Sequence, residues 1–188
     1  MRAARIGYAD PPYPGCSHLY KDDPFYDGEA AEVDHQELIE RLELDYDGWV
    51  LHTHVPGLAV VMPHLPEEAR IMAWVKPFAA FKRNVPLAYA WEPVIVKAAR
   101  KPVVGGLGGT LRDFISEPIA MMRGLPGVKP DAVCRWAFEA AGALPTDDLH
   151  DMYPGSGAVG RAWDAWRSQP RLDAAPDTEQ MAIEGVER

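Results

Sequence analysis

The stretch Arg2–Tyr13, RAARIGYADPPY, sets the pattern on which the fold prediction rests. Residues 2–9 form a short, partly apolar segment, which predicts a strand. Asp10-Pro11-Pro12-Tyr13 then ends the strand in a rigid turn, because each proline fixes φ and removes one N–H donor. Four further segments predict strands in the same way: Gly48–Thr53, Arg70–Lys76, Leu87–Lys97 and Asp148–Tyr153.

Helical segments alternate with these strands. Asp34 and Glu37 form a capping box that opens the first helix. Three further segments predict helices: Gly57–Leu65, Pro130–Ala141 and Ala158–Arg167. Strands that alternate with helices predict an α/β domain with a largely parallel sheet, and such sheets bind ligands beyond the carboxyl ends of their strands.

Two segments depart from this regular alternation. Pro93 interrupts the Leu87–Lys97 strand, which suits an edge strand or a bulge. Val103–Met122 contains Gly105, Gly106, Gly108 and Gly109, and we interpret it as a flexible loop that covers the substrate. A phosphate-binding loop is the alternative for these glycines, but no helix start follows them.

Length and composition predict one domain over residues 1–167, followed by a disordered tail over residues 168–188. No apolar run approaches the ~20 residues that span a bilayer, and no apolar segment of a signal peptide is present, so we expect no membrane partner. Cys16 and Cys134 are the two cysteines, which excludes a disulfide framework. These features predict a cytoplasmic protein, and the excess of Arg over Lys suggests a bacterial or phage origin.

The charge is distributed unevenly along the chain. The formal net charge is −9, yet Arg70–Arg135 contains eleven Lys and Arg against four Asp and Glu. A polyanion could therefore bind this middle region, although chance clustering on a solvated surface explains the same pattern. The candidate phosphate contacts are Lys76, Lys82, Arg83, Lys97, Arg100, Lys101 and Arg112.

Two turns contain the groups that could perform chemistry. At Asp10-Pro11-Pro12-Tyr13, the Asp10 carboxylate and the Pro11 carbonyl are acceptors beside a flat ring, an arrangement that suits a planar group with an NH₂. At Asp151–Gly157, a strand ends in a glycine-rich turn that opens a helix, where a ligand could approach backbone N–H groups. Taken singly, each is also what an ordinary turn looks like.

Together the two turns resemble the amino-group DNA methyltransferases that use S-adenosylmethionine. Asp10-Pro11-Pro12-Tyr13 is similar to their catalytic (D/N/S)PP(Y/F/W) motif, and Asp151–Gly157 is similar to their D-x-F-x-G-x-G cofactor motif, with Tyr153 at the aromatic position. Lys129-Pro130 resembles their K-P motif. The order of the three motifs matches the permuted subclass often called β. The resemblance covers Arg5 to Trp166.

The resemblance implies a Rossmann-like methyltransferase fold and methyl transfer from S-adenosylmethionine to adenine N6 of double-stranded DNA, with the target base flipped. It assigns catalysis to Asp10, Pro11, Pro12 and Tyr13, with Tyr13 stacking on the base. It assigns cofactor binding to Asp10, Lys129, Pro130, Asp151, Tyr153, Gly155, Ser156 and Gly157. Cytosine N4 is an alternative acceptor, and a non-catalytic relative that binds nucleic acid or a partner is a second alternative. A restriction–modification system or a phage is the expected setting.

The chain departs from the family pattern in two places. No target-recognition domain is evident between Lys97 and Lys129. The family has two more strands after the helix that ends near Trp166, the first with an acid that holds the cofactor ribose, and Asp164 and Asp173 are poor substitutes. We therefore expect a sheet shortened at its C-terminal end, and a homodimer or a partner subunit could supply the missing contacts.

Other candidates fit structural roles better. His52, His54 and His64 lack the further ligands of a zinc site, so we predict no metal. Trp74, Tyr89 and Trp91 fit a core better than stacking platforms. Glu92, in the Trp-Glu-Pro run, is a further candidate of interest, although an exposed strand carboxylate is the simpler interpretation.

Overall fold

The computed structural model describes residues 2–20, 32–77, 86–102, 110–120 and 128–169. Its centre is a sheet with the strand order β5-β3-β4-β2-β1-β6. The strands are β1 (Arg5–Ala9), β2 (Gly48–His52), β3 (Arg70–Val75), β4 (Trp91–Lys97), β5 (Phe114–Ser116) and β6 (Asp148–Asp151). β4 is antiparallel to both of its neighbours, whereas β1 pairs in parallel with β2 and β6, and β3 pairs in parallel with β5. The predicted α/β class with a mostly parallel sheet is therefore confirmed.

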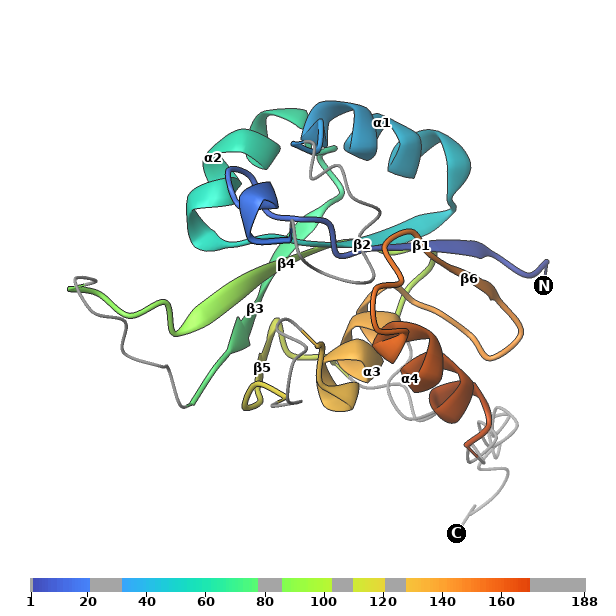
Figure 1. Cartoon of the computed structure of the whole chain (residues 1–188). Coiled ribbons are helices and arrows are strands. Elements are labelled where there is room, and N and C mark those ends of the chain that lie inside the picture. The colour runs from blue at the N-terminus through green and yellow to red at the C-terminus, as the bar shows by residue number, and fades with distance from the viewer. Residues whose placement is uncertain (1, 21–31, 78–85, 103–109, 121–127, 170–188) are drawn as a thin grey trace, which may run out of the picture.

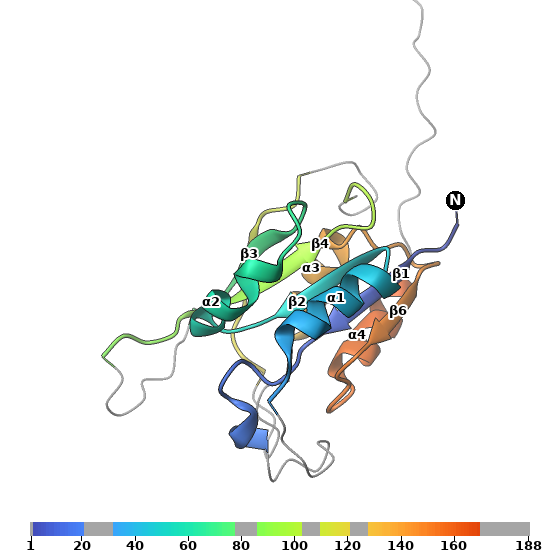
Figure 2. The same cartoon turned by 90° about the horizontal axis from the view of Figure 1, so that it is seen from above.

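Helices cover both faces of this sheet (Figure 1). The α-helices are α1 (His35–Asp45), α2 (Leu58–Val61), α3 (Asp131–Ala140) and α4 (Ala158–Arg167). α1 and α2 lie on one face, and α3 and α4 lie on the other, as the view from above also shows (Figure 2). Short 3₁₀ helices occupy Ser17–Tyr20, Val55–Gly57 and Met62–His64. None of the helices in the described part of the chain is long and apolar enough to cross a membrane.

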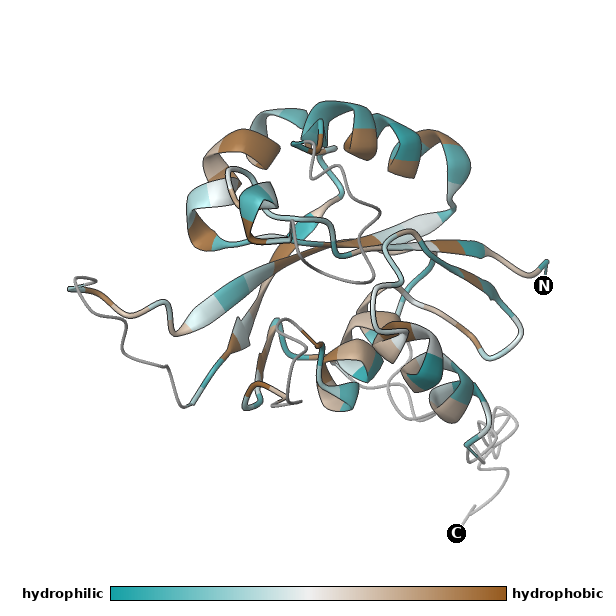
Figure 3. Ribbon diagram, viewed as in Figure 1, coloured by the Kyte–Doolittle hydropathy of each residue, from teal (hydrophilic) through white to brown (hydrophobic). Residues whose placement is uncertain are grey.

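The core has two halves because the central strands are buried on both faces. Trp49 and Leu51 of β2 pack toward α1, whereas Val50 packs toward α3 and α4. Apolar residues accordingly concentrate on the sheet and on the helix surfaces that face it (Figure 3). A Cβ on Gly7 would lie 2.9 Å from Leu42 and Tyr46, so glycine at this position lets α1 pack closely on β1.

Local signals placed the helices well. The Asp34 side chain caps α1 by accepting a hydrogen bond from the Glu37 N–H at 3.0 Å, as the capping box predicts. α3 begins directly after Pro130, and Gly142, with φ of 67°, follows its last turn. α4 has the predicted limits.

The predictions for the Pro93 strand and for the Val103–Met122 loop were wrong in part. Pro93 lies in β4, which is a central strand and not an edge strand. Its carbonyl accepts from the Thr53 N–H, so its nitrogen also faces Thr53, beyond the last registered pair of β2 and β4, and the bond that proline cannot donate falls at the end of this ladder. The predicted Val103–Met122 loop contains β5; Gly105–Gly109 within that loop lie outside the described residues, as do residues 170–188 of the predicted tail.

The topology brings distant parts of the sequence to one edge of the sheet. Every strand except β4 runs in the same direction, so five strands end at this carboxyl edge and β4 begins there. After β1 the chain continues into α1 on one face, and after β6 it continues into α4 on the other. The neighbouring ends of β1 and β6 are thus a topological switch point, where open α/β sheets bind ligands.

Candidate active site

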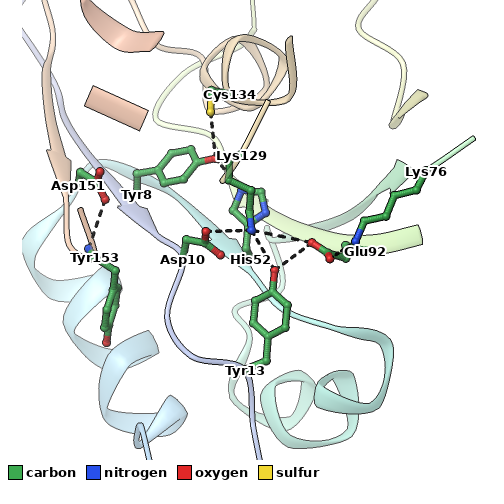
Figure 4. Close-up of polar contacts among 10 residues, drawn as sticks. All are labelled: Tyr8, Asp10, Tyr13, His52, Lys76, Glu92, Lys129, Cys134, Asp151 and Tyr153. Atoms are coloured by element: carbon green, nitrogen blue, oxygen red, sulfur yellow. Dashed lines mark hydrogen bonds and ion pairs between the residues drawn. The ribbon is translucent and has the colours of Figure 1, made fainter. Parts of the chain in front are cut away.

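A buried lysine joins the first turn to α3. Lys129 precedes α3, and its side chain is only 6% exposed. Its Nζ lies 2.9 Å from Asp10 Oδ2 and donates to the Tyr13 hydroxyl at 3.1 Å (Figure 4). The K-P and Asp-Pro-Pro-Tyr segments, more than a hundred residues apart in sequence, therefore form one cluster.

Glu92 is the second carboxylate of this cluster. It is the second residue of β4, and its side chain is 16% exposed, so the expectation of an exposed strand carboxylate was wrong. Oε2 accepts a hydrogen bond from the Tyr13 hydroxyl at 3.0 Å and lies 3.9 Å from Lys129 Nζ, and Oε1 pairs with Lys76 (Figure 4). The cluster holds two carboxylates and two ammonium groups, so their formal charges cancel.

Burial and pairing shift the pKa values of these groups. Burial raises the pKa of the Asp10 carboxyl above its ordinary value, and the Lys129 ammonium opposes that rise. Burial favours neutral Lys129, but the carboxylates of Asp10 and Glu92 outweigh it, so the pKa of Lys129 is raised. Burial also opposes ionisation of Glu92, yet the two lysines lower the pKa of Glu92. Proximity to cations therefore favours the ionised form of Glu92 and offsets part of the effect of burial on Asp10.

The Tyr13 ring is held from two directions. One face stacks on the His54 imidazole, with ring centroids 5.5 Å apart and planes at 16°. The hydroxyl donates to Glu92 and accepts from Lys129. Burial, with the negative charges of Asp10 and Glu92, raises the pKa of Tyr13 well above its ordinary value, so the hydroxyl keeps its proton as a donor.

Tyr8, His52 and Cys134 form a second group of buried polar side chains near Asp10. The Tyr8 hydroxyl lies 2.7 Å from His52 Nε2 and 4.0 Å from Cys134 Sγ. All three side chains are buried. Burial lowers the pKa of His52 well below its ordinary value, and the positive charges of Lys129 and Lys76 lower it further, so the imidazole is neutral. This histidine supports the site from inside the core.

The glycine-rich turn lies beside Asp10 at the switch point. Asp151 ends β6 opposite Tyr8 of β1, and the Met152 N–H donates to the Tyr8 carbonyl at 2.9 Å. The Tyr153 N–H donates to Asp151 Oδ1 at 3.3 Å (Figure 4). Burial, opposed by this hydrogen bond, raises the pKa of Asp151 to about 6.

Two glycines of this turn have backbone conformations that other residues adopt only with strain. Gly155 has φ of 42° and Gly157 has φ of 73°, and Gly157 caps α4. A Cβ on Gly155 would meet only the Tyr153 carbonyl oxygen, at 3.9 Å, so the backbone there is open to approach. Between them, Ser156 uses its carbonyl to accept from Arg161 at 2.8 Å, which braces the turn against α4.

The structure separates most of the predicted phosphate contacts from this site. Lys97 pairs with Glu43 at 2.6 Å and Arg100 pairs with Asp147, both at the opposite edge of the sheet. Lys101 and Arg112 are exposed. Lys101 follows the last residue of β4 by four positions, and Arg112 precedes the first residue of β5 by two, and both of these strand termini lie at that same opposite edge. Lys76 lies at the carboxyl edge but is paired with Glu92. Lys82 and Arg83 lie outside the described residues.

The histidines and aromatic residues divide between core and surface. No cluster of three or more His, Cys, Asp or Glu in the described ranges could hold a metal ion. Trp74 is buried, as the core prediction requires, but Tyr89 is 57% exposed. Glu92 and His54 contact Tyr13, although the motifs did not point to either residue. The sequence signal for Glu92 was a carboxylate between Trp91 and Pro93 in an otherwise apolar strand.

Comparisons with known proteins agree on the fold. No protein-family model matches the chain, and no curated protein sequence matches it. The crystal structure of the M1.HpyAVI–SAM complex superposes with a TM-score of 0.56 at 17% identity, covering 89% of this chain and 79% of that one. The structure of M1.HpyAVI alone gives 0.52 at 17% identity, covering 89% and 78%. These similarities show that the chain shares the Rossmann-like α/β fold of the M1.HpyAVI structures.

Proposed function

We propose that the chain is an S-adenosylmethionine-dependent methyltransferase that modifies adenine N6 in double-stranded DNA. The observation that supports this most is the position of Asp10: its carboxylate lies at the switch point, paired with Lys129 and next to the glycine-rich turn. A hydrogen-bond acceptor for an amino group and a place for a cofactor thus adjoin each other.

Asp10 is the residue that we assign to the reacting nitrogen. Adenine N6 is a poor nucleophile because its lone pair is conjugated with the ring. Acceptors on its two hydrogens, the Asp10 carboxylate and the Pro11 carbonyl, favour a pyramidal nitrogen and stabilise the positive charge that develops on it. A carboxylate can accept several hydrogen bonds, so the contact with Lys129 leaves acceptor capacity for the substrate.

The residues at the switch point fit S-adenosylmethionine. The open backbone at Gly155, the α4 N-terminus after Gly157 and the half-buried Asp151 could hold its polar groups. Lys129 could pair with a carboxylate of the ligand while it orients Asp10. The cofactor supplies an activated methyl group, and the chain's contribution is to place the acceptor nitrogen in line with it. The M1.HpyAVI neighbour was crystallised with SAM, which favours the same ligand here.

Tyr13 and the basic residues are assigned to the nucleic acid. His54 covers one face of the Tyr13 ring, so we place the flipped base on the other face. Lys82 and Arg83 lie in sequence between β3 and β4, and the end of β3 and the start of β4 both lie at the carboxyl edge. They are therefore better candidates for phosphate contacts than Lys97 and Arg100, which are paired with acids at the far edge.

Nucleoside mass spectrometry of DNA from cells that express the chain tests this proposal. N6-methyladenine is the expected product, N4-methylcytosine would establish the alternative acceptor, and no modified base would favour the non-catalytic relative. Asp10→Ala should lower kcat by at least ~100-fold, because one preorganised hydrogen-bond partner is lost. The affinity for S-adenosylhomocysteine, measured by calorimetry, should change little. Methylation that survives in Asp10→Ala would remove the assignment of this residue.

A further inference from the structure

Glu92 belongs to the charged cluster of Asp10, Tyr13, Lys76, Glu92 and Lys129, and it contacts all of the other side chains but that of Asp10. It accepts a hydrogen bond from the Tyr13 hydroxyl, pairs with Lys76 and lies 3.9 Å from the ammonium of Lys129. It enters the cluster from β4, which runs against the other strands and therefore begins at the carboxyl edge. No motif in the chain assigns it a role.

We propose that Glu92 is a positioning residue for the methyl transfer proposed above, which holds the Tyr13 ring and the Lys129 ammonium in the one arrangement that a flipped base can use. The flipped base in this inference rests on the proposed function, whereas the positioning role rests on the contacts of Glu92 with Tyr13, Lys76 and Lys129.

The Tyr13 ring needs such a constraint. Stacking on His54 holds the plane of the ring but permits it to slide and rotate within that plane. The hydrogen bond from the hydroxyl to Glu92 Oε2, at 3.0 Å, restricts this freedom together with the Lys129 ammonium, which donates to the same hydroxyl at 3.1 Å. With these contacts in place, the ring face opposite His54 is held in position relative to Asp10, and the base that we place there needs little further ordering before the reaction step.

The carboxylate also balances the charges around Asp10. Lys76 and Lys129 both approach Glu92, and without its charge Lys76 would lose its ion pair and Lys129 would keep Asp10 as its carboxylate partner. Lys129 would then be free to shift from the Tyr13 hydroxyl. A neutral amide keeps the size of Glu92 but not its charge, so Glu92→Gln separates these effects from packing.

Glu43 provides a matched control on the opposite edge of the sheet. Its carboxylate accepts from the Trp49 indole and from Lys97, each at 2.6 Å, which parallels the contacts of Glu92 with an aromatic donor and a lysine. Its side chain is 29% exposed. Glu43→Gln removes a comparable ion pair far from Asp10, and we expect kcat to stay within about 3-fold of wild type.

The kinetic test is a cycle of Glu92→Gln, Tyr13→Phe and the double variant. Each single variant should lower kcat by about 10- to 100-fold, the value of one charge-assisted hydrogen bond. The double variant should be no slower than the slower single variant within about 3-fold, because Tyr13→Phe already removes the hydrogen bond that Glu92→Gln weakens. S-adenosylhomocysteine affinity should stay within about 3-fold. Losses that multiply, or an unimpaired Glu92→Gln, would overturn the proposal.

A second measurement works without activity. The carboxylate of Glu92 and its hydrogen bond contribute to the raised pKa of Tyr13. With 3-fluorotyrosine incorporated, ¹⁹F NMR should show the Tyr13 phenol titrating at lower pH in Glu92→Gln and unchanged in Glu43→Gln, with Tyr13→Phe identifying the resonance. An unshifted titration would refute the coupling. If wild-type protein does not methylate DNA, the proposed function fails, and this titration alone decides whether Glu92 holds Tyr13.

Discussion

Lys129→Met should destabilise the fold strongly and in a pH-dependent manner. The substitution keeps a long apolar side chain but removes the ammonium that pairs with Asp10 and Glu92. The two carboxylates are 18% and 16% exposed, so water can compensate them only in part. Lys76 still pairs with Glu92, which leaves Asp10 as the group without a cation.

The magnitude follows from the burial of these groups. Removing one partner of a buried ion pair costs about 3–5 kcal/mol, and the residual exposure of Asp10 places this case at about 3 kcal/mol. For a chain of this length, 1 kcal/mol corresponds to roughly 2–4 °C in Tm, so we expect Tm to fall by roughly 6–12 °C. The matched Lys97→Met breaks the pair with Glu43, whose members are 25% and 29% exposed, and should cost about 1 kcal/mol or less.

Urea unfolding at pH 7.5 and at pH 5 measures both effects. Burial already raises the pKa of Asp10, and loss of Lys129 raises it further, so the carboxyl takes up a proton more readily as the pH falls. The cost of Lys129→Met should therefore shrink at pH 5, and it should also shrink in Lys129→Met combined with Asp10→Asn. A loss below 1 kcal/mol at pH 7.5, or one that is equal at both pH values, would refute the reasoning.

Three further predictions concern the glycine-rich turn, Asp151 and the nucleic acid. Gly157→Ala forces alanine to φ of 73°, so it should cost about 1–2 kcal/mol and weaken S-adenosylhomocysteine binding. Gly160→Ala, at the third residue of α4 where an added Cβ meets nothing within 4 Å, should instead stabilise by about 0.5–1 kcal/mol. Calorimetry and thermal unfolding would show equal effects of the two substitutions if the turn were not strained. The pKa of Asp151 is raised to about 6 in the fold from about 3.9 in the unfolded chain, so its stabilising contribution is present below pH 4 and is lost as the pH rises through 6. Asp151→Asn should therefore match the stability of the wild type near pH 4 and exceed it at pH 7.5. Urea unfolding that gave parallel curves of stability against pH for the two proteins would contradict this. Reversing Lys82 and Arg83 to Glu should weaken DNA binding for all sequences and flatten the slope of log K against log salt, and an unchanged slope would place the phosphate contacts elsewhere.

Much of the fold could be predicted because its signals are local. The cap at Asp34, the start of α3 after Pro130 and the glycine at position 157 each depend on backbone requirements within a few residues. Pro93 led to a wrong prediction because proline is excluded from a central strand only where the neighbouring strand would accept a hydrogen bond from its missing N–H. Whether it would do so depends on where β2 ends, which is a property of the partner strand and not of the segment around Pro93.

The motifs identified Asp10, Tyr13 and Lys129 as candidate site residues, and the structure brings all three into contact. Glu92 could not be found in the same way, because its burial and its partners come from segments far from it in sequence. The same holds for the basic residues: composition groups Lys97 and Arg100 with Lys76, but the reversed direction of β4 carries Lys97 and Arg100 to the opposite edge.

The sequence by itself therefore determined five of the six described strands, the α-helices and the chemical groups available for a reaction, since these depend on neighbouring residues and on side-chain identity, but it did not reveal β5. Only the tertiary structure decided which groups meet. Strand order and direction set which ends share an edge, and burial then gives the charges of Asp10, Glu92, Lys76 and Lys129 their mutual effect, because charges interact strongly only when they are close and shielded from water.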